Sequence, residues 1–138
     1  MAKKRPYPDR SFRVFVSHAT ADKWIAKTIC EKIDAVPGCS TFRDDRDIDG
    51  GDKISLTIKN EIRASDELLL LMTATSITRQ WVILEVGVAW GNDIRIVPVC
   101  YDVSIQTVPV LSDVRAYPLN DLDRYLDQLN RRARRERP

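Results

Sequence analysis

Histidine and cysteine are scarce in this chain of 138 residues, and their scarcity excludes several kinds of site. There is one histidine, His18, and there are three cysteines, Cys30, Cys39 and Cys100, with no Cys-x-x-Cys spacing. Neither a zinc site nor a framework of disulfides is expected from this set. A Ser-His-Asp or Cys-His triad would have to be built around His18. We therefore predict no metal site and three reduced thiols.

Long hydrophobic runs are also missing. The longest continuous apolar run, Leu68–Met72, has the length of a strand, far below the roughly 20 residues that a membrane helix needs. The basic start of the chain is not followed by an apolar segment of the signal-peptide type. We therefore expect a cytoplasmic location and no contact with a membrane.

The net charge of +2 hides an uneven distribution. The first ten and the last eight residues hold nine basic and two acidic residues, so residues 11–130 keep 13 basic and 18 acidic ones, a net charge of −5. A basic face for nucleic acid is not expected on such a body. We predict a basic tail at 1–10, one domain at 11–130 and an Arg-rich tail at 131–138, because charge runs at chain ends are usually solvated.

The order of apolar and turn-forming residues predicts alternating strands and helices. Strands are expected at 12–16, 39–42, 68–72, 94–99 and 115–118, and helices at 22–34, around 54–62, at 81–90 and from 120 onward. This alternation is typical of an α/β domain in which helices cover both faces of a parallel sheet of about five strands. Ligands of such folds bind at the carboxyl ends of the strands. We therefore expect a ligand-binding site among the segments that follow these strand ends, at residues 17–18, 43–52 and 73–80.

One predicted helix carries an isolated charge. The segment Trp81–Trp90 is apolar around its whole circumference, with Glu85 as its single charged residue, so we expect this helix to be buried on most sides. No residue one turn away along the helix can pair with Glu85, and a buried carboxylate without a partner is unfavourable. Glu85 should therefore face a cleft or meet a partner from elsewhere, unless it forms a structural salt bridge or lies at an edge in water.

Other candidate residues flank the strand ends. Trp81 lies one turn before the helical carboxylate and could stack on a ligand ring, whereas Trp24 and Trp90 are expected to pack in the core. Ser17 and His18 follow the first strand. Adjacent side chains rarely face each other, so we expect a turn residue and a surface histidine rather than a catalytic dyad; His18 could still line a pocket.

The loop at 43–52 is rich in aspartate and glycine. Its spacing does not match a calcium-binding loop, and interleaved basic residues nearly neutralise it. The chain contains no G-x-G-x-x-G or Walker A motif, so a phosphate cradle of those kinds is not expected. The loop is either a solvated connection or a recognition loop.

Four stretches, in order, resemble the TIR (Toll/interleukin-1 receptor) domain family in its bacterial form. They are Phe12–Asp22, similar to the opening strand and its Ser-x-x-x-x-Asp turn; Phe42–Ile54, similar to the BB loop; Trp81–Glu85, similar to the Trp-Cys-x-x-Glu stretch of the third helix; and Ile94–Val99, similar to the fourth strand. The resemblance spans about 11–129. Gly50 stands where the BB loop often has proline, and Val82 where many members have cysteine.

This resemblance implies a flavodoxin-like three-layer sandwich and an activity. Many bacterial and plant TIR domains cleave NAD⁺ to nicotinamide and ADP-ribose or a cyclic isomer, with NAD⁺ as substrate and no cofactor. The family's catalytic glutamate falls on Glu85. Expected substrate-binding residues are Trp81, Ser17, His18, Arg46 and Asp45, and expected protein-interaction residues of the BB loop are Asp47, Ile48, Asp49, Gly50 and Gly51.

The resemblance also implies partners. We expect self-association through TIR–TIR contacts, a downstream effector that senses a nucleotide product, and a role in bacterial antiphage signalling. Two alternatives stay open: a non-catalytic TIR adaptor that binds through the BB loop, with Glu85 structural, and an enzyme related to nucleoside deoxyribosyltransferases.

Overall fold

A computed structural model describes residues 11–43, 56–105, 111 and 113–136. Asp45, Arg46 and the predicted BB-loop residues 47–51 lie outside the described residues. Predictions about these positions therefore stay predictions.

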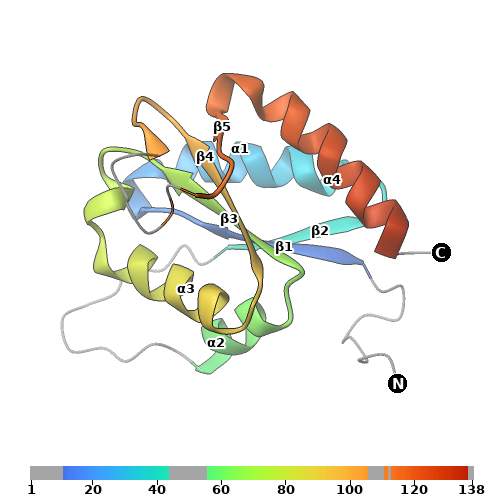
Figure 1. The fold of residues 1–138 in the computed structure, drawn as a ribbon, viewed down its shortest axis with the longest axis horizontal. Helices are drawn as coiled ribbons and strands as arrows, with labels where there is room; N and C mark the ends of the chain where they lie inside the picture. Colours follow the sequence, from blue (N-terminus) through green and yellow to red (C-terminus); the bar gives the residue numbers. More distant parts are fainter. Residues whose placement is uncertain (1–10, 44–55, 106–110, 112, 137–138) are drawn as a thin grey trace.

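Five parallel strands form one sheet in the order β2-β1-β3-β4-β5. The strands are β1 (Phe12–Ser17), β2 (Cys39–Arg43), β3 (Glu67–Met72), β4 (Arg95–Cys100) and β5 (Tyr117–Pro118). The helices are α1 (Lys23–Asp34), α2 (Leu56–Arg63), α3 (Gln80–Gly91) and α4 (Leu122–Glu136). α1 and α4 cover one face of the sheet, and α2 and α3 cover the other (Figure 1). The predicted flavodoxin-like three-layer sandwich is confirmed.

Alternation along the strands divides the core into two clusters. In β1, Val14 and Val16 pack with α1 and α4, whereas Phe15 packs with α2 and α3. In β3, Leu69 and Leu71 belong to the first cluster, while its even-numbered residues belong to the second. Both faces of these strands are thus covered, which explains why their sequences are continuous apolar runs.

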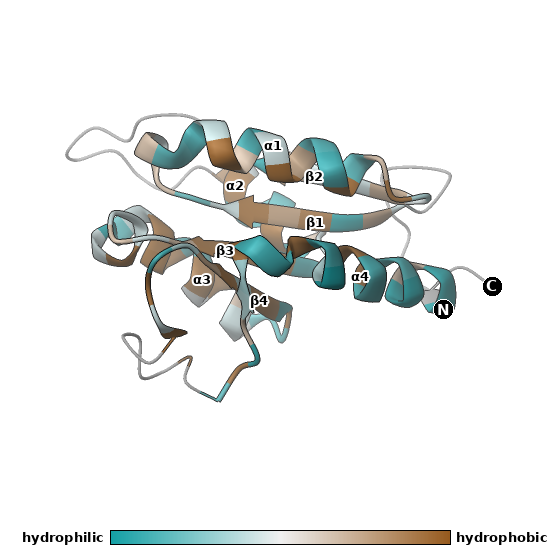
Figure 2. Ribbon diagram, turned by 90° about the horizontal axis from the view of Figure 1, so that it is seen from above, coloured by the Kyte–Doolittle hydropathy of each residue, from teal (hydrophilic) through white to brown (hydrophobic). Residues whose placement is uncertain are grey.

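Two of the three tryptophans were wrongly predicted. Trp24 and Trp90 were expected in the core, but they are 78% and 72% exposed. The expectation that α3 is buried on most sides is also wrong, because Ile83 and Leu84 share its exposed side with Trp90. Figure 2 shows the contrast between α3, largely coloured as hydrophobic, and α4, largely coloured as hydrophilic.

α4 runs past the predicted start of the Arg-rich tail. It extends to Glu136, because Leu122, Tyr125, Leu129 and Ala133 continue one buried stripe at helical spacing. No helix within the described residues combines the length and apolar character that a membrane span requires.

Candidate functional site

The carboxyl end of β1 meets the inner side of α3. Odd-numbered residues of β1 face α2 and α3, and Ser17 is the last of them. Its hydroxyl donates a hydrogen bond of 2.6 Å to Oε1 of Glu85. Ser17 is fully buried and Glu85 is 4% exposed. The carboxylate thus meets a partner from elsewhere in the fold, as the sequence required, and a charge-assisted hydrogen bond offsets part of the unfavourable burial.

His18 is buried beside this pair, so the expectation of a surface histidine is wrong. Its side chain is 4% exposed, and Nδ1 lies 3.5 Å from the carbonyl oxygen of Val16. The residue follows β1 directly and is enclosed at the carboxyl edge of the sheet. Ser17 and His18 thus lie together at the end of β1, and a pocket-lining role for His18 stays a prediction.

Trp81 lies in the first turn of α3. Its side chain is half-buried and packs against the cluster between the sheet and α2 and α3. The indole Nε1–H is buried and makes no hydrogen bond with any residue in the described part of the chain. A buried N–H donor of this kind usually has a partner, so Trp81 offers a donor as well as an aromatic surface, one turn before Glu85.

Hydrogen bonds connect the turn that follows β1 to the residues that follow β3. The Thr73 hydroxyl donates a hydrogen bond of 2.6 Å to Oδ2 of Asp22. Thr73 and Ser76 also exchange backbone-to-side-chain bonds, from Thr73 N to Ser76 Oγ and from Ser76 N to Thr73 Oγ1. Thr73 was not among the named candidate residues, although it opens the segment 73–80 in which a site was expected. Its signal was present, because the residue directly follows a buried strand at the edge where ligands bind.

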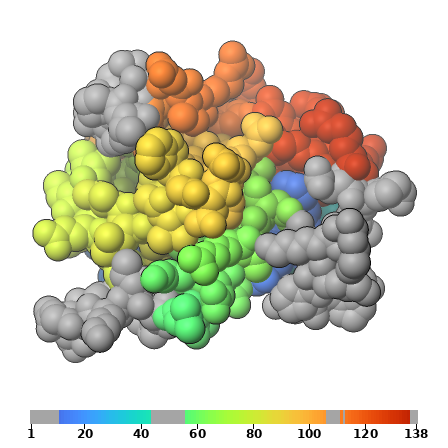
Figure 3. Space-filling view, turned by 60° about the horizontal axis from the view of Figure 1, so that its bottom comes forward, coloured from blue at the N-terminus to red at the C-terminus, as the bar shows by residue number. Residues whose placement is uncertain are grey.

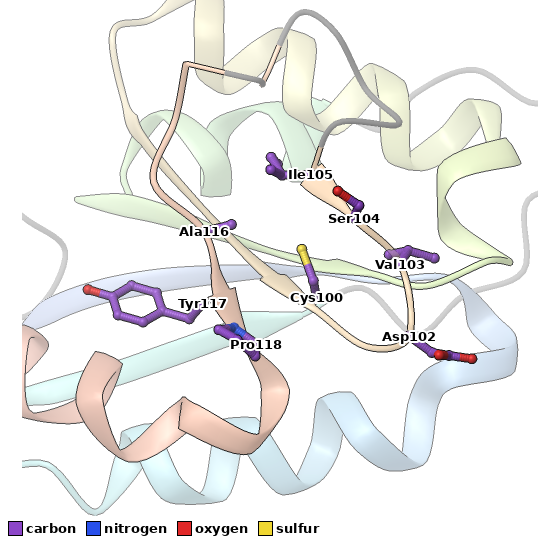
Figure 4. A pocket seen from close by; sticks show the side chains of 8 residues that line it. All are labelled: Cys100, Asp102, Val103, Ser104, Ile105, Ala116, Tyr117 and Pro118. Carbon is purple, nitrogen blue, oxygen red and sulfur yellow. The ribbon is translucent and has the colours of Figure 1, made fainter.

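A separate cavity opens at the same edge, at the ends of β4 and β5 (Figure 4). Its volume is about 520 Å³, and its lining includes Cys100, Asp102 and Tyr117 but neither Ser17 nor Glu85. Burial raises the pKa of the Cys100 thiol above its ordinary value, so this thiol is a weak nucleophile at neutral pH.

The described residues thus gather four of the sequence candidates, Ser17, His18, Trp81 and Glu85, where β1 and α3 meet. They contain no group of three His, Cys, Asp or Glu side chains arranged to hold a metal ion. The assembled groups are a carboxylate, a hydroxyl, an imidazole and an indole. Such a set can stabilise positive charge and position a polar substrate without a metal.

Comparison with known proteins identifies the family. A family model described as "TIR domain" matches residues 14–133. The chain belongs to the TIR domain family. A search of curated proteins finds no match.

One solved structure similar to this TIR domain is "Structure of the activated Roq1 resistosome directly recognizing the pathogen effector XopQ (TIR domains)". The TM-score is 0.56 at 23% sequence identity, over 73% of this chain and 64% of the other. At this identity the likeness supports the fold alone.

Proposed function

We propose that this TIR domain cleaves the nicotinamide–ribose bond of NAD⁺, giving nicotinamide and ADP-ribose or a cyclic isomer, with Glu85 as the catalytic carboxylate. The observation that carries the proposal is the buried hydrogen bond between Ser17 and Glu85 at the carboxyl edge of the sheet. Glu85 is the single charged residue of the otherwise apolar segment Trp81–Trp90, and it lies at the edge of the sheet where ligands of parallel sheets bind. Contact with a ligand would explain why a charged residue stands at this position.

The chemistry fits a single carboxylate. As the glycosidic bond breaks, positive charge develops on the ribose, and a nearby carboxylate stabilises it. The nicotinamide ring is positively charged in NAD⁺ and becomes neutral when the bond to the ribose breaks. Its departure therefore needs no general acid. Water then adds to the ribose cation and releases a proton to solvent, giving ADP-ribose, or a hydroxyl or base of the same substrate adds to it, again with release of a proton, giving a cyclic product.

The neighbouring residues supply binding and orientation. The Ser17 hydroxyl fixes Oε1 of Glu85, so the carboxylate is held in one orientation before substrate arrives. Trp81 offers an aromatic surface for a base or nicotinamide ring and a buried indole N–H for a polar atom. His18 lines the same strand end. In this proposal Asp45 and Arg46 also contact NAD⁺.

The biological role is proposed from the family. The Roq1 structure concerns an activated assembly that recognises a pathogen effector, and by analogy with it we propose an immune role for this chain. We propose that the product acts as a signal in bacterial antiphage defence, that an effector protein senses it, and that copies of the chain assemble through TIR–TIR contacts that include the predicted BB loop.

The experiment that tests the activity incubates concentrated protein with NAD⁺ and, separately, with nucleosides and deoxynucleosides. Chromatography and mass spectrometry then identify the products. We expect nicotinamide release from NAD⁺ and no cleavage of nucleosides, with the mass of the second product separating hydrolysis from cyclisation. Cleavage of nucleosides with no effect on NAD⁺ would instead support a deoxyribosyltransferase-like enzyme and refute the proposal.

A non-catalytic adaptor is the second candidate, and the exposed apolar side of α3 favours it, because such surfaces mark protein contacts. An adaptor would bind partner TIR domains and release no nicotinamide at any protein concentration. The loss of partner binding on replacing Ile48 or Asp49, together with no NAD⁺ turnover, would support it.

A further inference from the structure

A chain of hydrogen bonds runs from the turn after β1 to the start of α3. It begins at the carboxylate of Asp22, which accepts a hydrogen bond of 2.6 Å from the Thr73 hydroxyl. The same hydroxyl accepts a hydrogen bond of 3.0 Å from the Ser76 N–H. The Ser76 carbonyl oxygen in turn accepts one of 3.0 Å from the N–H of Arg79, the residue directly before α3. The position of the first turn of α3 is therefore linked to the turn after β1.

The segment between β3 and α3 is enclosed where these bonds form. Thr73 is 4% exposed and Ser76 is 1% exposed, and the Ser76 hydroxyl also accepts a hydrogen bond of 2.8 Å from the Thr73 N–H. Figure 3 shows this segment (yellow-green) directly beside α3 (yellow) on one side of the molecule. The Thr73 hydroxyl both donates and accepts, and its burial leaves little room for water to replace either bond. Its loss must therefore disturb the path into α3.

Asp22 makes this contact in place of a local one. It occupies the position before α1 at which an aspartate usually accepts a hydrogen bond from the backbone of the first helical turn. Its side chain makes no such capping bond. The carboxylate instead contacts Thr73, which lies 51 positions away along the chain. The start of α1 thus lacks a side-chain cap, and the aspartate connects two segments at the edge of the sheet where ligands bind.

The turn after β1 is therefore attached to the region of α3 at two points. Ser17 bonds Glu85 on the inner side of the helix. Asp22, later in the same turn, bonds Thr73 at the start of the segment that leads into the helix. Trp81 lies between these two points, in the first turn of α3. The carboxylate thus has a direct partner in the turn, whereas the tryptophan depends on the second attachment.

Trp81 has no polar anchor of its own. Its indole N–H makes no hydrogen bond with any residue that the structure describes. Packing against neighbouring side chains and the backbone of the first turn of α3 therefore determine where the ring lies. A shift of that turn moves the ring, and small displacements of a group that positions substrate have large effects on an enzyme.

We propose that Asp22 and Thr73 are positioning residues for substrate binding: their hydrogen bond fixes the start of α3 and holds the Trp81 ring where it stacks on a ring of NAD⁺. The effect on substrate binding rests on the function proposed above, whereas the effect on the position of Trp81 does not. Because Glu85 has its own bond to Ser17, loss of the positioning bond should weaken substrate binding more than it slows the chemical step.

Steady-state kinetics of nicotinamide release test the role in substrate binding. Thr73→Val removes the hydroxyl and keeps the shape of the side chain. Asp22→Ala removes the acceptor at a partly exposed position and leaves the bonds between Thr73 and Ser76 in place. We expect each of these two disrupting variants to raise KM for NAD⁺ by about tenfold with kcat nearly unchanged. Thr73→Ser and Asp22→Asn, the two conservative variants, keep a hydroxyl donor and an oxygen acceptor and should restore the wild-type KM.

Thr41→Val is the matched control. It removes a hydroxyl that donates a hydrogen bond of 2.9 Å to the carboxylate of Asp34, which is the same kind of contact between β2 and the end of α1. It should leave KM unchanged. A fall in kcat at constant KM in both disrupting variants would show only a smaller folded fraction and would overturn the proposal. An equal rise of KM in Thr41→Val would overturn it too.

Fluorescence tests the position of Trp81 without NAD⁺. The chain has three tryptophans, so Trp24→Phe and Trp90→Phe together, both at exposed positions, leave Trp81 as the single emitter. In this background the two disrupting variants should shift the emission maximum to longer wavelength and increase quenching by acrylamide, because the ring becomes more accessible to water. The conservative variants and the control should show neither change. Circular dichroism at the same temperature should show every variant folded.

The two tests separate the positioning role from the proposed activity. A chain that releases no nicotinamide but shows the expected change in fluorescence refutes only the proposed activity. A chain that cleaves NAD⁺, with KM and fluorescence unchanged in both disrupting variants, refutes only the positioning role of Asp22 and Thr73.

Discussion

At the scale of single residues, the Ser17–Glu85 hydrogen bond has two effects: it stabilises a buried carboxylate, and it orients that carboxylate. A bond from a hydroxyl to a charged acceptor contributes about 1.5 to 3 kcal/mol to stability. If orientation matters, losing Ser17 should also lower the rate of the chemical step with little effect on substrate binding.

The first prediction concerns Ser17→Ala. We expect kcat for nicotinamide release to fall by about tenfold with KM nearly unchanged, since the carboxylate keeps its charge but loses its orientation. Ser65→Ala is the matched control, because it removes another buried hydroxyl, bonded to the Glu61 carbonyl at the opposite end of β3. An equal loss of kcat in both variants would show that Ser17 contributes to the stability of the fold and not to the orientation of Glu85.

The second prediction concerns Trp81. Stacking of a base on an aromatic side chain is worth about 1–3 kcal/mol, so Trp81→Ala should raise KM by about 5- to 150-fold. Trp81→Phe keeps a ring and loses the indole N–H, so it should have a smaller effect. Steady-state kinetics measure both, beside Trp24→Ala as a surface control. If KM is unchanged in Trp81→Ala, Trp81 does not contribute to substrate binding and serves only in core packing.

At the scale of elements, α4 is fixed to the sheet by a buried polar cluster. Glu67 at the start of β3 is fully buried. It accepts a hydrogen bond of 2.6 Å from the Tyr125 hydroxyl and two of 3.0 Å from the Arg132 guanidinium. These partners lie 58 and 65 residues away along the chain. Residue spacing carries no signal for such contacts, which is why the sequence predicted only a solvated tail at Arg132.

The third prediction concerns alkaline pH. Burial first, then the charge and hydrogen bond of Glu67, raise the pKa of Tyr125 well above 10, with Cys39 adding to the shift and Arg132 opposing it. The folded chain therefore holds this proton more tightly than the unfolded chain. The resulting stability is fully present below about pH 10, the ordinary tyrosine pKa, and is lost as the pH rises above it.

Urea unfolding checks this prediction. Tyr125→Phe should be about 1.5–3 kcal/mol less stable than wild type at neutral pH, and the difference should shrink above pH 10. Tyr101→Phe, at an exposed position, should match wild type throughout. A constant difference between Tyr125→Phe and wild type across the alkaline range would contradict the assignment.

α3 shows what an apolar pattern can and cannot predict. The sequence identified the helix and the isolation of Glu85, and it required a partner for that carboxylate. It could not tell which side of an all-apolar helix packs on the sheet. The amino acids on the two sides are similar, and only the positions of neighbouring elements distinguish them. Trp90 therefore looked like a core residue and is exposed.

At the scale of the whole molecule, strand–helix alternation was enough to predict a parallel sheet covered on both faces, and the family resemblance added the three-layer type. Strand–helix alternation also placed Ser17 at the carboxyl edge of the sheet, where a site was expected, because strand ends follow from strand assignments. It did not give the pairing of Ser17 with Glu85. That contact depends on the pleat of β1 and the rotation of α3 together.

The fourth prediction links assembly to activity. If TIR–TIR contacts between copies help to form the site around Glu85, nicotinamide release per chain should rise with protein concentration. Initial rates from nanomolar to high micromolar protein measure this. A specific activity that is constant over this range would show that assembly and catalysis are independent.

The most direct test of the central claim is nicotinamide release by wild type and Glu85→Gln, measured side by side at one high protein concentration. The substitution removes the charge at nearly constant volume, and the amide oxygen can still accept the Ser17 hydrogen bond, so unfolding midpoints should stay close. We predict a rate at least about a hundredfold lower in the variant. Release by Glu85→Gln at the wild-type rate would contradict the role assigned to Glu85.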